Sequence, residues 1–135
     1  MIWIVLFLSM IWLHIYDDYH TQGILAQFKQ KNWWKENYPQ DLYKRDWLIA
    51  LYEHAFQWAF TTMLPLLVYS IWIWMESGFY HGLIQWVGLL VINTEFHAEI
   101  DNEKANELTI SLFTDQILHI LQIGITIILF MIGVN

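Results

Sequence analysis

The chain has 135 residues, of which 57% are hydrophobic and 18% aromatic, and its formal net charge is −7. The length suits a single domain, but the apolar fraction exceeds that of ordinary soluble domains and indicates a membrane protein. The acidic balance argues against nucleic-acid binding, and the absence of cysteine excludes disulfides, thiolate metal sites and cysteine nucleophiles.

The first apolar segment, residues 1–22, has no charged side chain before Asp17. A signal peptide would have a basic start and a small-residue cleavage site, and this segment has neither. We therefore expect a retained transmembrane helix here.

The next stretch, residues 24–46, contains five of the six Lys and Arg residues of the chain. Aromatic residues are interleaved with them: Phe28, Trp33, Trp34, Tyr38 and Tyr43. Basic and aromatic residues mixed in this way are typical of an amphipathic segment that lies in the membrane interface. Pro39 is expected to end any helix before it.

Three more apolar segments follow, at residues 47–75, 79–101 and 108–134. Each has the length of about 20 residues that crosses a bilayer. Pro65 predicts a kink in the first of them, and residues 76–78 predict a tight turn. The expected fold is all-α: a single membrane domain, residues 1–135, that forms an integral membrane four-helix bundle with the interfacial segment between its first two helices.

The distribution of basic residues predicts the orientation. Five lie between the first two predicted spans, and the sixth, Lys104, lies between the last two. By the positive-inside rule both of these loops are cytoplasmic, and both termini and residues 76–78 face outward. The lipid bilayer is thus the expected partner, and the bacterial inner membrane is the expected location.

Three pairs of ionisable residues stand out, each with its members four positions apart: His14 with Asp18, His97 with Asp101, and Asp115 with His119. This spacing places both members of a pair on one face of a helix. On the expected topology the three pairs, together with His54, fall at a similar depth near the cytoplasmic interface.

Imidazole and carboxylate groups that converge from several helices are how helical bundles build metal centres. We predict His14, Asp18, His97, Asp101, Asp115 and His119 as metal ligands. This donor set suits Zn, with Mn or Fe as alternatives. Because six ligands exceed what one Zn takes, either two ions bind or some of these residues support the others. The alternative is a purely structural role, in which these residues form a polar network that holds the helices together.

The same motifs resemble the domain-of-unknown-function 3307 family of small multipass membrane proteins, especially its phage and prophage members. The resemblance spans nearly the whole chain. It rests on His14-x3-Asp18, Glu53-His54, His97-x3-Asp101-x2-Lys104 and Asp115-Gln116-x2-His119. It implies a phage or bacterial membrane setting and supports this grouping of residues, but it implies no particular reaction.

Three functions are consistent with these residues. The first is a metal-dependent hydrolase for a lipid head group or a small phosphorylated substrate, with His54 or a spare carboxylate as general base and Lys104 facing the negative charge of the substrate. The second is a non-enzymatic phage protein that binds a host membrane protein or excludes a second phage, either alone or as a homo-oligomer. The third is a proton or ion relay.

Overall fold

The computed structural model describes residues 1–78 and 80–134. Four long helices make up most of it, namely α1 (Ile2–Tyr16), α4 (Asp46–Ser77), α5 (His81–Asn102) and α6 (Leu112–Val134). Five shorter elements connect or extend them: the π-helix η1 (Asp17–Thr21), α2 (Leu25–Phe28), α3 (Lys31–Asn37), the 3₁₀-helix η2 (Asp41–Tyr43) and the π-helix η3 (Glu103–Glu107). The described residues contain no strand, and the predicted all-α class is confirmed.

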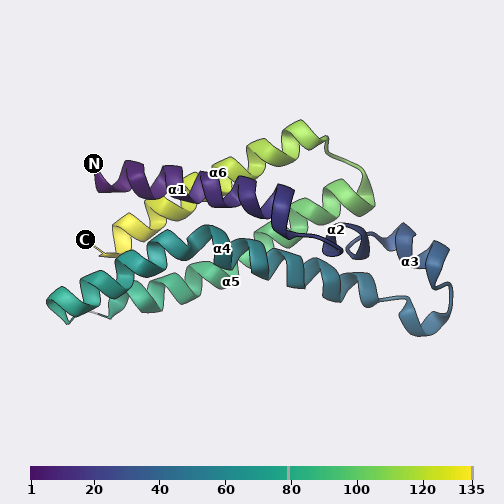
Figure 1. The fold of residues 1–135 in the computed structure, drawn as a ribbon, viewed down its shortest axis with the longest axis horizontal. Coiled ribbons are helices and arrows are strands. Elements are labelled where there is room, and N and C mark those ends of the chain that lie inside the picture. Colours follow the sequence, from purple (N-terminus) through teal and green to yellow (C-terminus); the bar gives the residue numbers. More distant parts are fainter. Residues whose placement is uncertain (79, 135) are drawn as a thin grey trace.

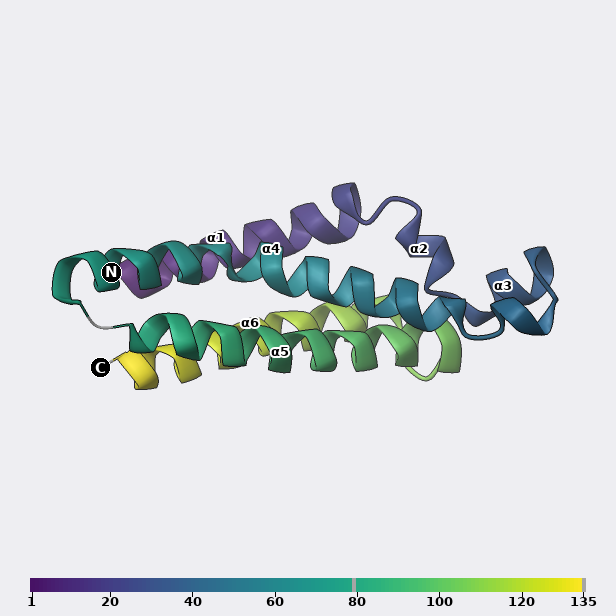
Figure 2. The same ribbon diagram turned by 90° about the horizontal axis from the view of Figure 1, so that it is seen from below.

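The four long helices lie side by side (Figures 1 and 2). Helix α4 packs against α1 and α5, and α6 packs against the same two helices, so the four close into a ring. The start of α1, the end of α4, the start of α5 and the end of α6 lie at one end of this ring. Helices α2 and α3 and the α5–α6 connection lie at the other end, which we call the polar end.

Three helical stretches are long and apolar enough to cross a membrane: Ile2–Thr21, Asp41–Ser77 and Leu112–Val134. The predicted span at residues 79–101 is not among them. Its helix, α5, carries Glu95, Glu99 and Asp101 in its last two turns, which lowers the apolar character of the whole helix. Length and composition therefore give three candidate membrane spans, and α5 is not one of them.

The core of the bundle is apolar, and so is most of its outer surface. Met10, Trp58, Leu66 and Phe130 are completely buried between the helices. Large apolar side chains are also exposed along every long helix. On α5, for example, Ile84 is 61% exposed, Val87 55% and Val91 59%. Apolar surface on this scale is expected where lipid replaces water around the helices.

The breaks between helices follow local sequence signals. Helix α3 ends at Asn37, two residues before Pro39, as predicted. Helix α4 ends at Ser77 and is capped by Gly78, whose left-handed φ of 73° costs a glycine little. Pro65 lies within α4, which stays helical on both sides of it. The predicted start of the next segment, Phe79, lies outside the described residues, and α5 begins at His81.

Candidate metal centre

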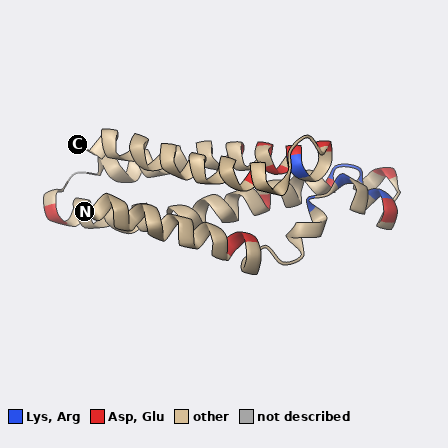
Figure 3. Cartoon of the chain, turned by 90° about the horizontal axis from the view of Figure 1, so that it is seen from above, with Lys and Arg blue, Asp and Glu red and all other residues tan. Residues whose placement is uncertain are grey.

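Charged side chains concentrate at the polar end, while the long helices are nearly free of them elsewhere (Figure 3). The predicted site residues lie just inside this end. Four histidines line the interior, one from each long helix: His14, His54, His97 and His119. Each is at most 1% exposed. The predicted convergence of the helices on one polar layer is therefore present in the structure.

The π-helix η1 lets two adjacent aspartates contact two different helices. Asp17 Oδ1 accepts hydrogen bonds from Gln57 Nε2 of α4 at 3.1 Å and from Thr21 Oγ1 at 2.5 Å. Asp18 Oδ2 accepts one from Gln116 Nε2 of α6 at 3.1 Å. The wider π-turn brings both carboxylates inward, and such turns are frequent at functional sites.

Trp58 of α4 organises the imidazoles. Its Nε1–H donates a hydrogen bond to His14 Nδ1 at 2.8 Å. Its ring stacks on His97 with centroids 4.1 Å apart, and His97 in turn stacks on His119 at 4.3 Å. Because Trp58 occupies Nδ1 of His14, only Nε2 of that ring remains for another ligand.

Two imidazole nitrogens and one carboxylate oxygen form a nearly equilateral triangle. His54 Nε2 lies 3.2 Å from Asp101 Oδ2 and 3.3 Å from His97 Nε2, and 3.6 Å separates His97 Nε2 from Asp101 Oδ2. Tetrahedral ligands at the usual Zn–N and Zn–O distances lie about 3.3–3.4 Å from each other. The three atoms therefore have the spacing of one face of a tetrahedral metal site.

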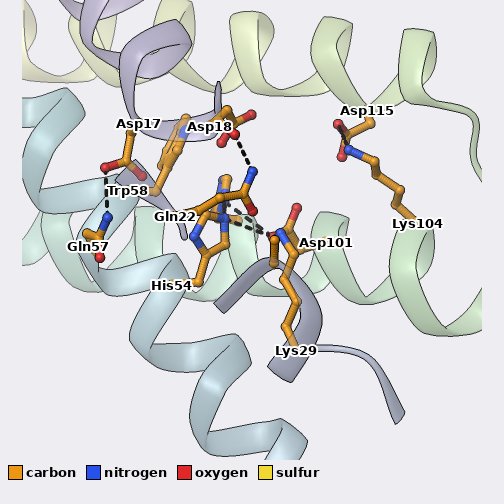
Figure 4. A network of polar contacts seen from close by, with 12 residues as sticks. Asp17, Asp18, Gln22, Lys29, His54, Gln57, Trp58, Asp101, Lys104 and Asp115 are labelled. Atoms are coloured by element: carbon orange, nitrogen blue, oxygen red, sulfur yellow. Dashed lines mark hydrogen bonds and ion pairs between the residues drawn. The ribbon is translucent and has the colours of Figure 1, made fainter. Parts of the chain in front are cut away.

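A fourth group, the ammonium of Lys29, reaches the same carboxylate. Lys29 Nζ lies 2.6 Å from Asp101 Oδ2, and both side chains are largely buried (Figure 4). Lys29 is the C-cap residue of α2, a short helix that packs against α4. Asp101 is thus neutralised by a lysine at the place where a cation would bind.

Several buried ring nitrogens have no hydrogen-bond partner among the described residues. They are His14 Nε2, His54 Nδ1, His97 Nδ1 and both nitrogens of His119. Buried polar atoms are normally paired with protein or with ordered water. His119 Nε2 lies 3.4 Å from Asp115 Oδ1 and 3.8 Å from Asp101 Oδ1, so it faces two carboxylates at ion-pair distance.

Buried His and Asp groups that could hold a metal ion are therefore present. Two sets have donor atoms that all lie within 4.8 Å of one another: Asp18, His54 and His97, and His97, Asp101 and His119. Four of the six predicted ligands belong to these sets. His54, which was predicted as a general base, lies among the possible metal ligands. Because both sets contain His97, they describe overlapping positions for a metal ion.

The other two predicted ligands and Lys104 have different partners. His14 is held by Trp58, although its Nδ1 also lies 3.7 Å from Asp18 Oδ2. Asp115 is completely buried and pairs with Lys104, whose Nζ lies 2.7 Å from Asp115 Oδ2. Lys104, predicted to face a substrate, thus neutralises a carboxylate of the bundle.

Five residues of this network are not among the predicted site residues: Asp17, Lys29, Gln57, Trp58 and Gln116. Lys29 falls in the predicted interfacial segment, residues 24–46, and Trp58 in the predicted apolar segment, residues 47–75, so neither has a signal of its own in the sequence. Gln116 had the strongest signal, because it lies directly beside Asp115 and three residues before His119.

Comparison with known proteins found no matching family model, no matching curated protein and no matching solved structure. The resemblance to the domain-of-unknown-function 3307 family therefore stays a prediction, and the function has to be argued from the geometry of the site.

Proposed function

We propose that this chain is an integral membrane metalloprotein of the bacterial inner membrane, in which His54, His97 and Asp101 hold a divalent ion. The triangle of their donor atoms, with sides of 3.2, 3.3 and 3.6 Å, supports this proposal. The point equidistant from the three atoms is about 2 Å from each, which is the usual distance of Zn to nitrogen and oxygen ligands. Zn is the proposed metal, with Mn or Fe as alternatives.

The proposed activity is hydrolysis of a phosphorylated compound or a lipid head group at the polar end. Three protein ligands leave a fourth position open, as in catalytic zinc sites. A bound metal lowers the pKa of water in that position toward neutrality. Asp18 is the proposed general base, because its carboxylate lies within 4.8 Å of the donor atoms of His54 and His97.

Metal analysis tests the site directly. Protein purified in detergent without chelator is expected to contain close to one Zn, Mn or Fe per chain by elemental analysis. His54→Gln and Asp101→Asn are each expected to reduce this content at least ten-fold. The matched control is His20→Gln, because His20 is exposed and, among the described residues, its ring stacks on Tyr16 alone.

Two outcomes would contradict the proposal. Folded wild-type protein that contains no metal and acquires none from added zinc would remove the metal centre. Metal-loaded protein that hydrolyses neither a chromogenic phosphodiester nor a phospholipid would keep the centre but remove the hydrolase. Asp101→Asn leaves Lys29 without its partner, so His54→Gln is the more informative variant if Asp101→Asn fails to fold.

A proton relay is the second candidate function, and one observation favours it. His119 Nε2 lies 3.4 Å from Asp115 Oδ1 and 3.8 Å from Asp101 Oδ1, so it bridges two carboxylates. Chains of Asp and His within a membrane are a common basis of proton transfer. Proteoliposomes should then show proton flux driven by a pH difference, and His119→Gln should abolish it. Flux unchanged by His119→Gln would exclude this route.

A further inference from the structure

A second polar region, separate from the histidines, is a pocket of about 400 Å³ formed by α3, η2 and the first turn of α4. Four aromatic rings line it: Trp34, Tyr38, Tyr43 and Trp47. Three lysines, Lys31, Lys35 and Lys44, line it as well, with Asp41 as the acidic member of the lining. The combination of rings and ammonium groups favours a ligand with both apolar and anionic parts.

Three of the rings, those of Trp34, Tyr38 and Tyr43, form a continuous wall. The centroids of Tyr38 and Tyr43 lie 5.3 Å apart, and those of Trp34 and Tyr38 lie 5.7 Å apart. Trp34 stacks on Tyr43 at 6.4 Å, and its Nε1–H donates to the Phe28 carbonyl oxygen at 2.6 Å. The wall is therefore held in place without any ligand.

The lysines differ in what they contact. Lys31 pairs with Glu107 at 2.5 Å and lies over the Trp47 ring, 4.5 Å from its centroid. Lys35 and Lys44 are exposed, and among the described residues no carboxylate lies within ion-pair distance of either. Two ammonium groups are thus available at the edge of the pocket to meet an anion.

The pocket lies where the apolar helices end. Trp47 lies in the first turn of α4, one of the candidate spans, and α3 extends beyond the bundle at the polar end (Figure 2). In a membrane this level corresponds to the head groups, where Trp and Tyr collect and where basic side chains attract anionic lipids. A phosphate ester that reaches the pocket from the bilayer needs no route through water.

We propose that this pocket binds the head group of an anionic phospholipid. The phosphate meets Lys35 and Lys44, and the rings of Trp34 and Tyr43 cover the glycerol and the upper acyl carbons. The site lies outside the histidine cluster and goes beyond the proposed hydrolase. Lipid binding and metal content are measured separately, so either proposal can fail without the other.

Native mass spectrometry of the full chain, released from detergent with added phosphatidylglycerol or phosphatidylcholine, tests this. Phosphatidylglycerol is expected to bind at least five-fold more tightly. Lys35→Gln and Lys44→Gln should each weaken its binding about five-fold, because each removes one of the two ammonium groups that meet the phosphate in the pocket. Arg45→Gln is the matched control, since Arg45 is exposed, follows Lys44 and does not line the pocket.

Three results would overturn the proposal. Equal binding of the two lipids would remove the anion preference. An equal loss in Arg45→Gln would show attraction to the whole basic segment rather than to the pocket. Displacement of phosphatidylglycerol by an equimolar amount of soluble glycerol phosphate would assign the pocket to a water-soluble phosphate ester. Thermal unfolding of the lysine variants at the wild-type temperature shows that they remain folded.

Discussion

Lys29 and the proposed metal ion compete for one carboxylate oxygen. Asp101 Oδ2 accepts from Lys29 Nζ at 2.6 Å and is also a corner of the ligand triangle, and the two side chains, Lys29 and Asp101, are only 11% and 4% exposed. An ion that binds there replaces the ammonium as the positive partner of Asp101. Metal binding should therefore displace Lys29. Removing the lysine should destabilise the metal-free protein but have little effect on the metal-bound protein.

Lys29→Met tests this competition. Removing one partner of a buried ion pair costs about 3–5 kcal/mol because the other charge is left uncompensated. We expect the metal-free variant to lose stability on this scale and zinc to restore most of it. Thermal unfolding in detergent, with chelator and with zinc, measures both. Lys44→Met, an exposed lysine, is the control, and an equal loss under both conditions would show that no ion contacts Asp101.

Trp58 supports the cluster through its indole nitrogen. The N–H donates to His14 Nδ1 at 2.8 Å, while the ring stacks on His97. Trp58→Phe keeps a ring in place but leaves Nδ1 of His14 unpaired, at a cost of about 1–3 kcal/mol. Thermal unfolding should show this loss, whereas Trp72→Phe, at an exposed tryptophan, should show little. Equal losses would mean that the hydrogen bond contributes nothing.

Asn106 of η3 forms hydrogen bonds to the backbone at the junction between α2 and α3. Its Nδ2 donates to the Lys29 carbonyl oxygen at 3.1 Å, and its Oδ1 accepts from the Lys31 N–H at 2.7 Å. These two bonds hold the backbone on either side of Gln30 and thereby orient Lys29 toward Asp101. The segment that carries the proposed lipid pocket is attached to the bundle at the same point.

Asn106→Ala should therefore loosen this segment without unfolding the bundle. Hydrogen exchange is expected to become faster at residues 29–37 and to stay unchanged in the middle of α4 and α6, because only local bonds are lost. Asn37→Ala is the control, since its Nδ2 donates within α3, to the Trp33 carbonyl oxygen. Faster exchange throughout the chain would show instead that Asn106 supports the whole fold.

The Lys31–Glu107 pair makes the same attachment sensitive to pH. The Lys31 ammonium, 2.5 Å away, lowers the pKa of the Glu107 carboxyl below its usual value. A lowered folded-state pKa stabilises the attachment above the unfolded value, and this contribution is lost as pH falls through the folded value. Protection factors at residues 29–37, which correct for the intrinsic slowing of amide exchange in acid, should thus fall for wild type as the pH falls. The Glu107→Gln variant should already exchange faster than wild type at residues 29–37 at neutral pH, and it should lack this acid-dependent loss of protection. Identical pH profiles of the two proteins would contradict the assignment.

Much of the helical framework could be predicted because polar runs separate long apolar segments. The predicted segment at residues 47–75 corresponds to α4 at Asp46–Ser77, and residues 108–134 contain α6 at Leu112–Val134. The stretch at residues 24–46 was less predictable, since it divides into α2, α3 and η2. Helices this short depend on tertiary packing rather than on their own periodicity.

The candidate site was predictable where it depends on local spacing. His97 with Asp101 and Asp115 with His119 are close because helical residues four apart share a face. Lys29 reaches Asp101 across 72 positions, and Trp58 reaches His14 across 44. Such contacts depend on how the helices pack against each other. No periodic pattern in the sequence links these positions, so the sequence alone did not predict the contacts.

For the whole molecule, the topology depends on whether α5 crosses the membrane. It is excluded from the candidate spans by composition, yet it packs against both α4 and α6 and exposes Ile84, Val87 and Val91. If the three candidate spans cross, α5 has to return the chain from the end at Gly78 to the polar end. We therefore expect α5 to be a fourth span, with its acidic last turns at the polar end.

Cysteine labelling tests this topology, and the absence of native cysteine makes the wild-type chain the blank. Glu36→Cys, Glu76→Cys and Thr109→Cys place exposed thiols in α3, at the end of α4 and between η3 and α6. Because five of the six basic residues lie between α1 and α4, a membrane-impermeant maleimide should label Glu76→Cys in intact cells. The other two should react only after permeabilisation. Labelling of Thr109→Cys together with Glu76→Cys would show that α5 does not cross.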